Sequence, residues 1–521
     1  MPVRPHVLFC RTGLSAVVLL AGGCRAQESP PPPLPVAPLP VAPLHWPVPP
    51  LPVWNPTAPV LEVALAAQLH PAGDPTASAP LRLQAAAGDL TLTDAAGHRV
   101  SAPQLLLHWR QQPLATPLRW RRRVLGPFAS FESAEQAATV WRQLGATPVI
   151  AHPREWEVWA HPDAVAPEGV ASRLEEGQQR QALGLELRRP GGSLALVAPV
   201  QITAKGGLLW KGGRYGGPFR LLPDAYGRWS LVEEVPLERY LEGVVPHEIG
   251  GGSPPAALAA QAVLARTWAL RNRHRFAVDG YHLCADTQCQ VYSDPRQASP
   301  AVRQAIAASR HQVLALEGQP IHAVYHASNG GVMAGFEEVW SGQALPYLRP
   351  TVDGPATLQG RLPLPLTGPG LVALLRGGGE AYGSDHPVYR WQRRLTAPQI
   401  ALALGALGKG LGQPNRLTVL SRGPSGRVLA LEIGGSSGGR RVLRLDAIRR
   451  TLRTLPSTLF TLAPAGPGVW QVEGGGFGHG AGLSQAGAID LARRGWSRDR
   501  ILQHYYPGAV LKPIEGLGGP P

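Results

Sequence analysis

The sequence predicts an α+β fold that is rich in strands, and three observations support this class. Strand-like runs separated by glycine turns begin near residue 185, as in LALVAPVQITA, GLLWKGGRYGG and GRWSLVEEV. Two helical patterns, one short and one long, follow between Val235 and Leu270. A β-α-β passage over residues 117–162 precedes both. At 521 residues the chain can bury more than one core, so we expect two or three domains.

Residues 1–24 have the features of an export signal. Arg4 and Arg11 precede an apolar run over 14–21, which is too short to span a bilayer as a mature helix. The run ends in LAGGC, which resembles a bacterial lipobox and predicts lipidation at Cys24. Ordinary cleavage after the following CRA is the alternative. We therefore expect an exported protein of the cell envelope, anchored to the membrane by an N-terminal lipid.

Residues 25–58 are rich in proline, and the motif LPVAP is repeated. Such a run favours extended polyproline II and cannot build a core. It predicts a semi-rigid spacer between the anchor and the folded part of the chain.

A small N-terminal domain is expected over 59–165. Weak strand-like alternation runs through residues 60–115, for which the sequence indicates no chemistry. Next comes a helix whose apolar face contains Ala134, Ala137, Ala138, Trp141 and Leu144. The piece GPFASFESAEQAATVWRQLG is similar to half of a SPOR-type domain, which implies glycan binding at 117–162; an unrelated small α/β domain is the alternative.

The stretch from Val235 to Leu270 carries the strongest signal in the chain. An apolar stripe with helical spacing begins at Leu237 and ends at Val244, where Pro246 stops the helix. Glu248 follows between apolar neighbours, and three glycines come after it. A free glutamate has a pKa of about 4.3, so Glu248 could act as an acid near neutrality only if those neighbours desolvate it.

A long helix over 256–270 is predicted to be buried nearly all round. Its only polar residues are Gln261, Arg266 and Thr267, which point in three different directions. A buried amide or guanidinium without a partner is costly, so Gln261 and Arg266 need partners.

The formal net charge of +15 suggests a polyanionic partner such as a membrane surface, nucleic acid or anionic glycan. No RNP-like run, zinc-finger spacing or helix-turn-helix pattern supports nucleic acid, so we expect none. The spacing Gly476-x-Gly478-x-x-Ala481 fits a dinucleotide fingerprint, but the strand and acidic residue that should follow are missing. We therefore predict no cofactor.

Cys284 and Cys289 are the two cysteines outside the export signal. In an oxidising compartment such close neighbours most simply form a local disulfide. A zinc site would need about four nitrogen or sulfur ligands, and His282 is the only histidine nearby. We expect a disulfide and no metal, with zinc as the alternative.

Four sequence blocks carry a resemblance to a known family. They are YLEGVVPHEIGGGSPPAALAAQAVLARTWAL around Glu248, HASNGG from His326, IRRTLRTLPSTLFTL from Ile448, and GGGFGHGAGLSQAGA around His479. Together they resemble the SpoIID/LytB family of peptidoglycan-acting proteins, with a domain over 185–515. Related proteins can carry a histidine beside the second cysteine and bind zinc, but here that position is Gln288.

The resemblance implies a lytic transglycosylase that cleaves MurNAc–GlcNAc bonds of denuded glycan strands and leaves 1,6-anhydroMurNAc ends. Glu248 would be the general acid and base. The substrate-binding residues implied in this way are Gln261, Arg266, His326, Asn329, His479, Ser484 and Gln485. For His326 and Asn329, turn formation before two glycines is the alternative.

Two other functions stay open at this point. A hydrolase with two carboxylates would need a partner acid ~5–10 Å from Glu248, for which Glu238 and Glu242 are the candidates. The family also includes proteins that enhance a cell-wall amidase. A non-catalytic, wall-binding enhancer of an N-acetylmuramoyl-L-alanine amidase is therefore the second prediction.

Overall fold

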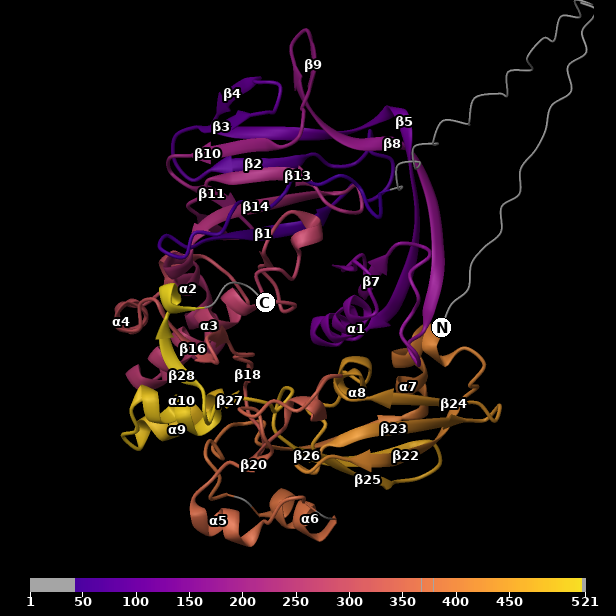
Figure 1. Ribbon diagram of the computed structural model, residues 1–521, viewed down its shortest axis with the longest axis vertical. Coiled ribbons are helices and arrows are strands. Elements are labelled where there is room, and N and C mark those ends of the chain that lie inside the picture. Colours follow the sequence, from indigo (N-terminus) through magenta and orange to yellow (C-terminus); the bar gives the residue numbers. More distant parts are fainter. Residues whose placement is uncertain (1–42, 367, 378, 518–521) are drawn as a thin grey trace, which may run out of the picture. The chain divides into compact units, whose positions relative to one another are not determined.

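The computed structural model describes residues 43–366, 368–377 and 379–517 (Figure 1). The predicted export signal, the lipidation site Cys24 and the first part of the proline-rich spacer lie outside the described residues. Within the described part of the chain, no helix combines the length and apolar character needed to cross a membrane. The structure contains both helices and many small sheets, which confirms the β-rich α+β class.

Two large sheets form the first half of the described chain (Figure 1). The first has the strand order β15-β1-β14-β13-β10-β3-β4. Its strands are β1 (Val60–Leu69), β3 (Leu90–Thr93), β4 (Arg99–Ala102), β10 (Val200–Ala204), β13 (Phe219–Pro223), β14 (Trp229–Pro236) and β15 (Leu283–Cys284). The second has the order β12-β11-β2-β5-β7-β6, and β8 pairs with both β5 and β9. Its strands are β2 (Leu81–Ala85), β5 (Gln104–Phe128), β6 (Val149–Ala151), β7 (Trp156–Ala160), β8 (Ser172–Arg189), β9 (Gly192–Ala195), β11 (Leu208–Trp210) and β12 (Gly213–Tyr215).

Strand pairing crosses the boundary that the sequence predicts between a domain over 59–165 and one over 185–515. β1 pairs with β14, β3 with β10, and β2 with β11. One hydrophobic core contains side chains from both ranges, among them Leu61 and Leu231. Residues 60–115 are therefore part of the same sheets as 185–236. Alternation reveals a strand but not its distant partner, which is why the sequence did not indicate this arrangement.

Helix α1 (Phe131–Gln143) lies against β7 and forms the core of the 117–162 passage. Ser130 caps its first turn by accepting a hydrogen bond from the Ser133 amide. Ala134, Ala138 and Trp141 are buried as predicted. Leu144 is 55% exposed, in contrast to its predicted place on the apolar face, because the helix ends one residue before it.

The two helices predicted between Val235 and Leu270 are present and buried. α2 (Leu237–Val245) is followed by a short π-helical turn, η1 (Pro246–Gly250), and then by α3 (Pro255–Arg271). Every α3 residue from Leu258 to Leu270 except Ala259 is buried. The elements around α3 are α2, α4 (Pro300–Ala308), β16 (Gln312–Leu316), β17 (Gln319–Pro320), α9 (Gln485–Arg493) and α10 (Arg498–Tyr505), and β28 (Val510–Pro513) pairs with β16.

The segment between His326 and His479 forms two further cores. The first is built on two three-stranded sheets, β21-β26-β25 and β22-β23-β24. The elements of the segment are β19 (Val332–Met333), β20 (Thr351–Val352), α5 (Ala356–Arg361), α6 (Gly368–Arg376), β21 (Arg390–Thr396), α7 (Ala397–Leu404), β22 (Pro414–Arg422), β23 (Val428–Gly435), β24 (Arg440–Arg444), α8 (Asp446–Thr451), β25 (Phe460–Pro464) and β26 (Val469–Gly475). Its two ends meet at β18 (Tyr325–His326) and β27 (Leu483–Ser484), which pair in parallel, and β27 leads into α9, which packs on α3.

Candidate active site around Glu248

Glu248 lies on the π-helical turn η1, directly after α2. The turn is held by its apolar members, because Val244 and Val245 are fully buried and Ile249 is nearly so. Gly250 adopts a φ of +85°, a conformation that favours glycine, and lets the chain turn toward α3. The carboxyl group of Glu248 is thus attached to a well-packed backbone while its side chain stays half-buried.

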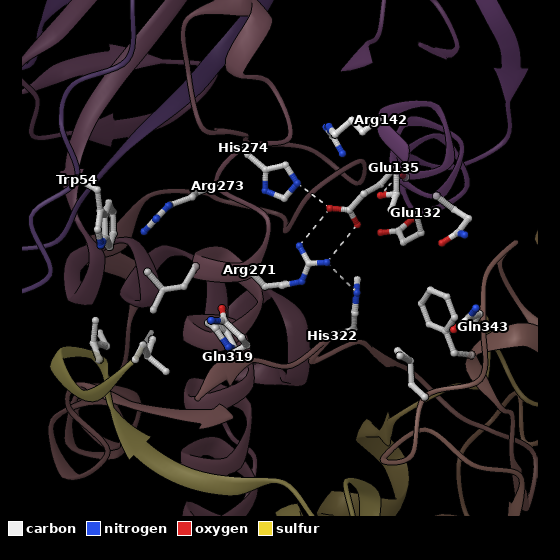
Figure 2. Close-up of a pocket in the computed structure, with 18 of the residues that line it drawn as sticks. Trp54, Glu132, Glu135, Arg142, Arg271, Arg273, His274, Gln319, His322 and Gln343 are labelled. Atoms are coloured by element: carbon white, nitrogen blue, oxygen red, sulfur yellow. Dashed lines mark hydrogen bonds and ion pairs between the residues drawn. The ribbon is translucent and has the colours of Figure 1, made fainter. Parts of the chain in front are cut away.

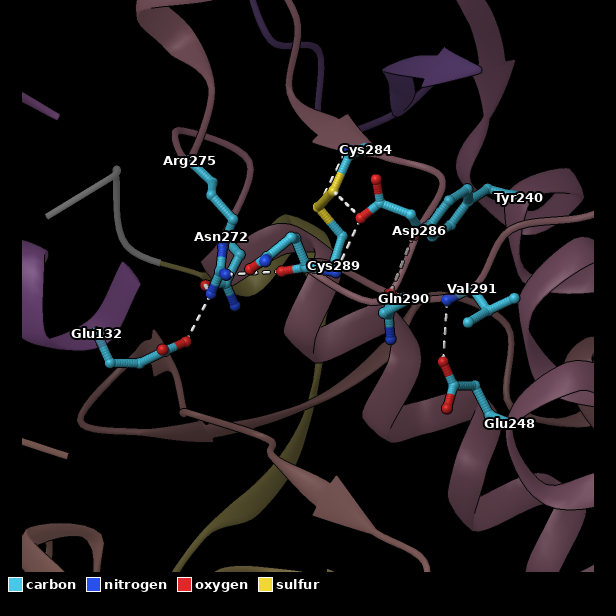
Figure 3. The surroundings of a disulfide bond; sticks show 11 residues. Glu132, Tyr240, Glu248, Asn272, Arg275, Cys284, Asp286, Cys289, Gln290 and Val291 are labelled. Atoms are coloured by element: carbon cyan, nitrogen blue, oxygen red, sulfur yellow. Dashed lines mark hydrogen bonds and ion pairs between the residues drawn. A yellow bond between two sulfur atoms is a disulfide. The ribbon is translucent and has the colours of Figure 1, made fainter. Parts of the chain in front are cut away.

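Two donors hold the Glu248 carboxyl group. The Val291 amide donates to Oε1 at 3.1 Å, as Figure 3 shows, and the Tyr325 hydroxyl is a second hydrogen-bond partner. Burial raises the pKa of Glu248 above its ordinary value, and these two hydrogen bonds oppose part of the rise. The net shift is upward, so a larger fraction of Glu248 is protonated at a given pH than of an exposed glutamate.

Gln290 determines the direction of the Tyr325 hydroxyl proton. The Gln290 side-chain amide donates to the Tyr325 oxygen at 2.9 Å, and the Tyr240 hydroxyl donates to the Gln290 carbonyl oxygen at 3.2 Å. Because a phenol has one proton and Gln290 already donates to its oxygen, the Tyr325 proton is available for Glu248. No sequence motif singled out Gln290 or Tyr325. The signals available were their positions beside Cys289 and His326.

A disulfide joins Cys284 and Cys289, whose Cα atoms are 5.7 Å apart. It closes the loop that leads directly to Gln290 and Val291 (Figure 3). His282, the nearby histidine, accepts a hydrogen bond from the Glu62 amide at 2.9 Å. The described residues contain no cluster of three or more His, Cys, Asp or Glu side chains that could hold a metal ion.

His326 and His479 lie beside Tyr325. Their ring centroids are 5.0 Å apart, and His479 Nε2 donates to the Tyr325 carbonyl oxygen at 2.9 Å. Burial lowers the pKa of His479 to about 4 and that of His326 well below its ordinary value, so both rings are neutral near pH 7. Tyr325 therefore connects Glu248, through its hydroxyl, with the histidine pair, through its carbonyl group.

Gln261 and Gln485 contact each other across α3 and α9. The Gln485 side-chain amide donates to the Gln261 carbonyl oxygen at 3.4 Å. Nε2 of the fully buried Gln261 has no hydrogen-bond partner within the described residues. A buried amide donor without a partner is uncommon, and it is consistent with a polar group that binds there from outside the chain.

Arg266, Asn329 and Ser484 are at most 1% exposed and make internal contacts. Arg266 forms a bidentate ion pair with Glu238, at 2.8 and 2.7 Å. Asn329 donates to Asp353 at 2.6 Å and closes a turn by accepting from the Gly331 amide. The Ser484 hydroxyl caps α9. These contacts give the three side chains structural roles and leave them little surface for a ligand.

Both candidates for a second carboxylate are occupied by ion pairs. Glu238 is held by Arg266, and Glu242 is paired with Arg239 and Arg303. Neither is comparable to Glu248, which has a raised pKa and no ion pair in the described part of the chain. Among these three glutamates, the one suited to donate a proton is Glu248.

Comparison with known proteins places these features in context. A family described as "Stage II sporulation protein" matches residues 225–316, and a domain of unknown function (DUF8618) matches 334–482. Stage II sporulation protein D of Bacillus amyloliquefaciens is 30% identical over 302 residues, which are 55% of this chain and 77% of that protein. An uncharacterized protein of Brachyspira hyodysenteriae is 26% identical over 63% of this chain and 80% of its own. An amidase enhancer of Bacillus subtilis is 27% identical over 52% of this chain and 40% of its own.

Proposed function

This chain belongs to the SpoIID/LytB family, and we propose that it is a lytic transglycosylase that cleaves the glycan strands of peptidoglycan. Its family gives it a cell-wall-related role, and the state of Glu248 supports the enzymatic reading. The single observation that carries the proposal is a half-buried carboxyl group with a raised pKa and two oriented hydrogen-bond donors.

In the proposed reaction Glu248 acts first as an acid and then as a base. It donates its proton to the oxygen between MurNAc C1 and the next GlcNAc, and the C1–O bond breaks. The carboxylate then accepts the proton of the MurNAc C6 hydroxyl, whose oxygen attacks C1 and closes the 1,6-anhydro ring. Glu248 regains in the second step the proton that it lost in the first, so the reaction requires neither a water molecule nor a second carboxylate.

The surroundings of Glu248 suit both halves of this cycle. Burial favours the protonated acid, while the Val291 amide and the Tyr325 hydroxyl stabilise the carboxylate that forms after proton transfer. The buried Gln261 amide donor and the buried Nε2 of His326, neither of which has a hydrogen-bond partner within the described residues, are the polar groups we assign to sugar binding, with Gln485 and His479 beside them.

A non-catalytic enhancer of a cell-wall amidase is the second candidate. The observation that favours it is the 27% identity to the amidase enhancer of Bacillus subtilis. In that case Glu248 would hold its loop in place, and the chain would bind wall glycan and a partner amidase without cleaving either.

We also infer export and a lipid anchor at Cys24. The LAGGC motif supports the anchor, and the proline-rich run over 25–58 would then space the enzyme from the membrane. Glycan binding by the SPOR-like passage at 117–162 belongs to the same proposal. It would help hold the enzyme on its substrate.

One experiment separates the two candidates. Purified protein and its Glu248→Gln variant are incubated with denuded glycan strands, and the products are analysed by mass spectrometry. The enzyme predicts 1,6-anhydro ends with the parent protein and none with the variant, which keeps the shape of the side chain but has no proton to donate. Binding of glycan by both proteins without any anhydro product would establish the enhancer instead.

A further inference from the structure

A pocket of about 1040 Å³ lies beside the C-terminal end of α3 (Figure 2). Its walls come from parts of the chain that are far apart in sequence: α1, the C-terminal end of α3, the segment around β17, residues 336–345 and the chain near 515. Glu248 precedes α3, whereas the pocket begins at Leu270 and Arg271 near the end of that 17-residue helix. This pocket is thus a separate site from the one described above.

Each carboxylate of the pocket lining already has a hydrogen-bonding partner within the chain. Glu135 accepts from Arg271 at 3.1 Å and from His274 at 2.7 Å (Figure 2). Glu132 is paired with Arg275 at 2.6 Å, and Glu515 with His311 at 2.9 Å. Arginines of the chain therefore balance the charges of Glu132 and Glu135, and a cationic ligand would find no carboxylate in the lining without a partner.

Two arginines of the pocket lining, Arg142 and Arg273, have no carboxylate partner within the described residues. Arg142 projects from α1, and the Arg273 guanidinium lies 4.6 Å from the centre of the Trp54 ring (Figure 2). Burial lowers the pKa of Arg273, because it is partly desolvated without a compensating anion. A guanidinium in this state is a good partner for the carboxylate of a ligand.

The donor and acceptor pattern of the pocket indicates the rest of the ligand. Arg271 donates to His322 Nε2 at 3.1 Å, and since arginine cannot accept, His322 is neutral and carries its proton on Nδ1. Burial lowers the pKa of His322 to about 4, in agreement with that state. Gln136, Gln143 and Gln343 add amides that both donate and accept, which is what hydroxyl and acetamido groups require.

Trp54 supplies the apolar surface. Its indole lines the pocket, and the Arg273 guanidinium covers one indole face, so one ligand can place an apolar ring beside the indole and an acidic substituent on the guanidinium. A sugar ring that carries a carboxylate has both features. A simple inorganic anion would use the arginines but not Trp54.

We propose that this pocket is a second glycan-binding site, which recognises a carboxylate-bearing amino sugar through Arg142, Arg273 and Trp54. The inference rests on the proposed function for the identity of the sugar, since the lactyl carboxylate of MurNAc is the acid that a denuded glycan strand exposes. The site binds a part of the strand away from the bond that is cleaved, and thereby holds the enzyme on its polymer.

The test uses two disaccharides that differ only in the lactyl group, GlcNAc–MurNAc and GlcNAc–GlcNAc. Each is titrated calorimetrically into the full-length Glu248→Gln protein, so that no cleavage interferes. We expect GlcNAc–MurNAc to bind roughly tenfold more tightly or better, the usual effect of a hydrogen bond to a charged group. Arg273→Gln or Arg142→Gln, made in the same protein, should remove much of that preference, because the single lactyl carboxylate binds one of the two guanidinium groups, and Trp54→Ala should weaken both ligands.

Arg310→Gln is the matched control, because Arg310 is an exposed arginine outside the pocket lining. It should bind both disaccharides as the parent does. Equal affinity of the parent for the two disaccharides would overturn the proposal, as would an unchanged preference in both pocket arginine variants whose thermal unfolding matches that of the parent. Cleavage of glycan by the unmodified enzyme is a separate measurement, so failure of the pocket and failure of the proposed activity are distinguished.

Discussion

The backbone amide of Val291 donates a hydrogen bond to Oε1 of Glu248 at 3.1 Å, although 43 residues separate them in the chain. Val291 is two residues beyond Cys289, whose disulfide with Cys284 closes the preceding loop. The position of the candidate catalytic carboxyl group is therefore set by two local structures, a π-helical turn that carries it and a cross-linked loop that contacts it.

Removing the Tyr325 hydroxyl should shift the pH dependence of cleavage. That hydroxyl lowers the pKa of Glu248, so Tyr325→Phe should raise it further. The acid must be protonated at the start of the reaction, so kcat/KM falls as pH rises through this pKa, and the variant should show that fall at higher pH. Its maximal rate should drop by up to about 100-fold, because the carboxyl group loses an orienting contact.

The measurement is a pH–rate profile of anhydro-product formation. Tyr382→Phe is the control, since Tyr382 packs on Trp496 and His504 and not on Glu248. An alkaline limb at the same pH in Tyr325→Phe and the parent would mean that the hydroxyl does not govern Glu248.

Loss of the disulfide should destabilise the protein and impair the site together. Cross-linking a loop of this length contributes about 2 kcal/mol through the entropy of the unfolded chain. We expect the Cys284→Ser/Cys289→Ser double variant to lose that amount in urea unfolding. Its cleavage rate should also fall, because Gln290 and Val291 directly follow the loop. The parent protein under reducing conditions should behave like the double variant; a reduced parent that remains as stable as the oxidised one would contradict this.

Glu135 should make the stability of the fold depend on pH in the acidic range. Although burial disfavours its charge, the hydrogen bond from His274 and the charge of Arg271 lower the pKa of Glu135 to about 2. A lowered carboxyl pKa contributes stability that is fully present above the unfolded value near 4.5 and is lost as pH falls toward 2.

The expected contribution at pH 7 is about 3 kcal/mol. Glu135→Gln should therefore unfold more easily than the parent at pH 7, and the difference should shrink between pH 4.5 and pH 2. Glu155→Gln, at an exposed glutamate, is the control. Urea unfolding at several pH values measures both, and a difference that does not vary with pH would show that charge is not its cause.

Arg266 should prove to be a structural residue. Its fully buried guanidinium forms two hydrogen bonds to Glu238 and one to the Gln312 carbonyl oxygen. Arg266→Met leaves Glu238 without its partner, which should cost roughly 3 kcal/mol of unfolding free energy. Adding Glu238→Gln should restore part of the loss, because the unpaired charge is then removed. If the double variant is no more stable than Arg266→Met, the ion pair is not what makes Arg266 important.

The sequence alone determined the local features of this protein. The all-round apolar pattern of 256–270 specified a buried helix, Val244, Val245 and Ile249 indicated a desolvated Glu248, and the five-residue spacing of Cys284 and Cys289 favoured their disulfide. These features depend on residues that are close together in sequence, so their pattern is visible in the order of residues. The sequence blocks that resemble the SpoIID/LytB family indicated which carboxyl group to consider as the catalytic one.

Only the tertiary structure decided the contacts between distant segments. It paired β1 with β14 across the expected domain boundary, and it brought Gln290 and Tyr325 to Glu248. It also paired Arg266 of α3 with Glu238 of α2, a contact that residue order did not indicate. Hydrogen bonds and ion pairs of this kind are set by packing of the whole core, and residue order carries no local signal of which partner each polar group will find.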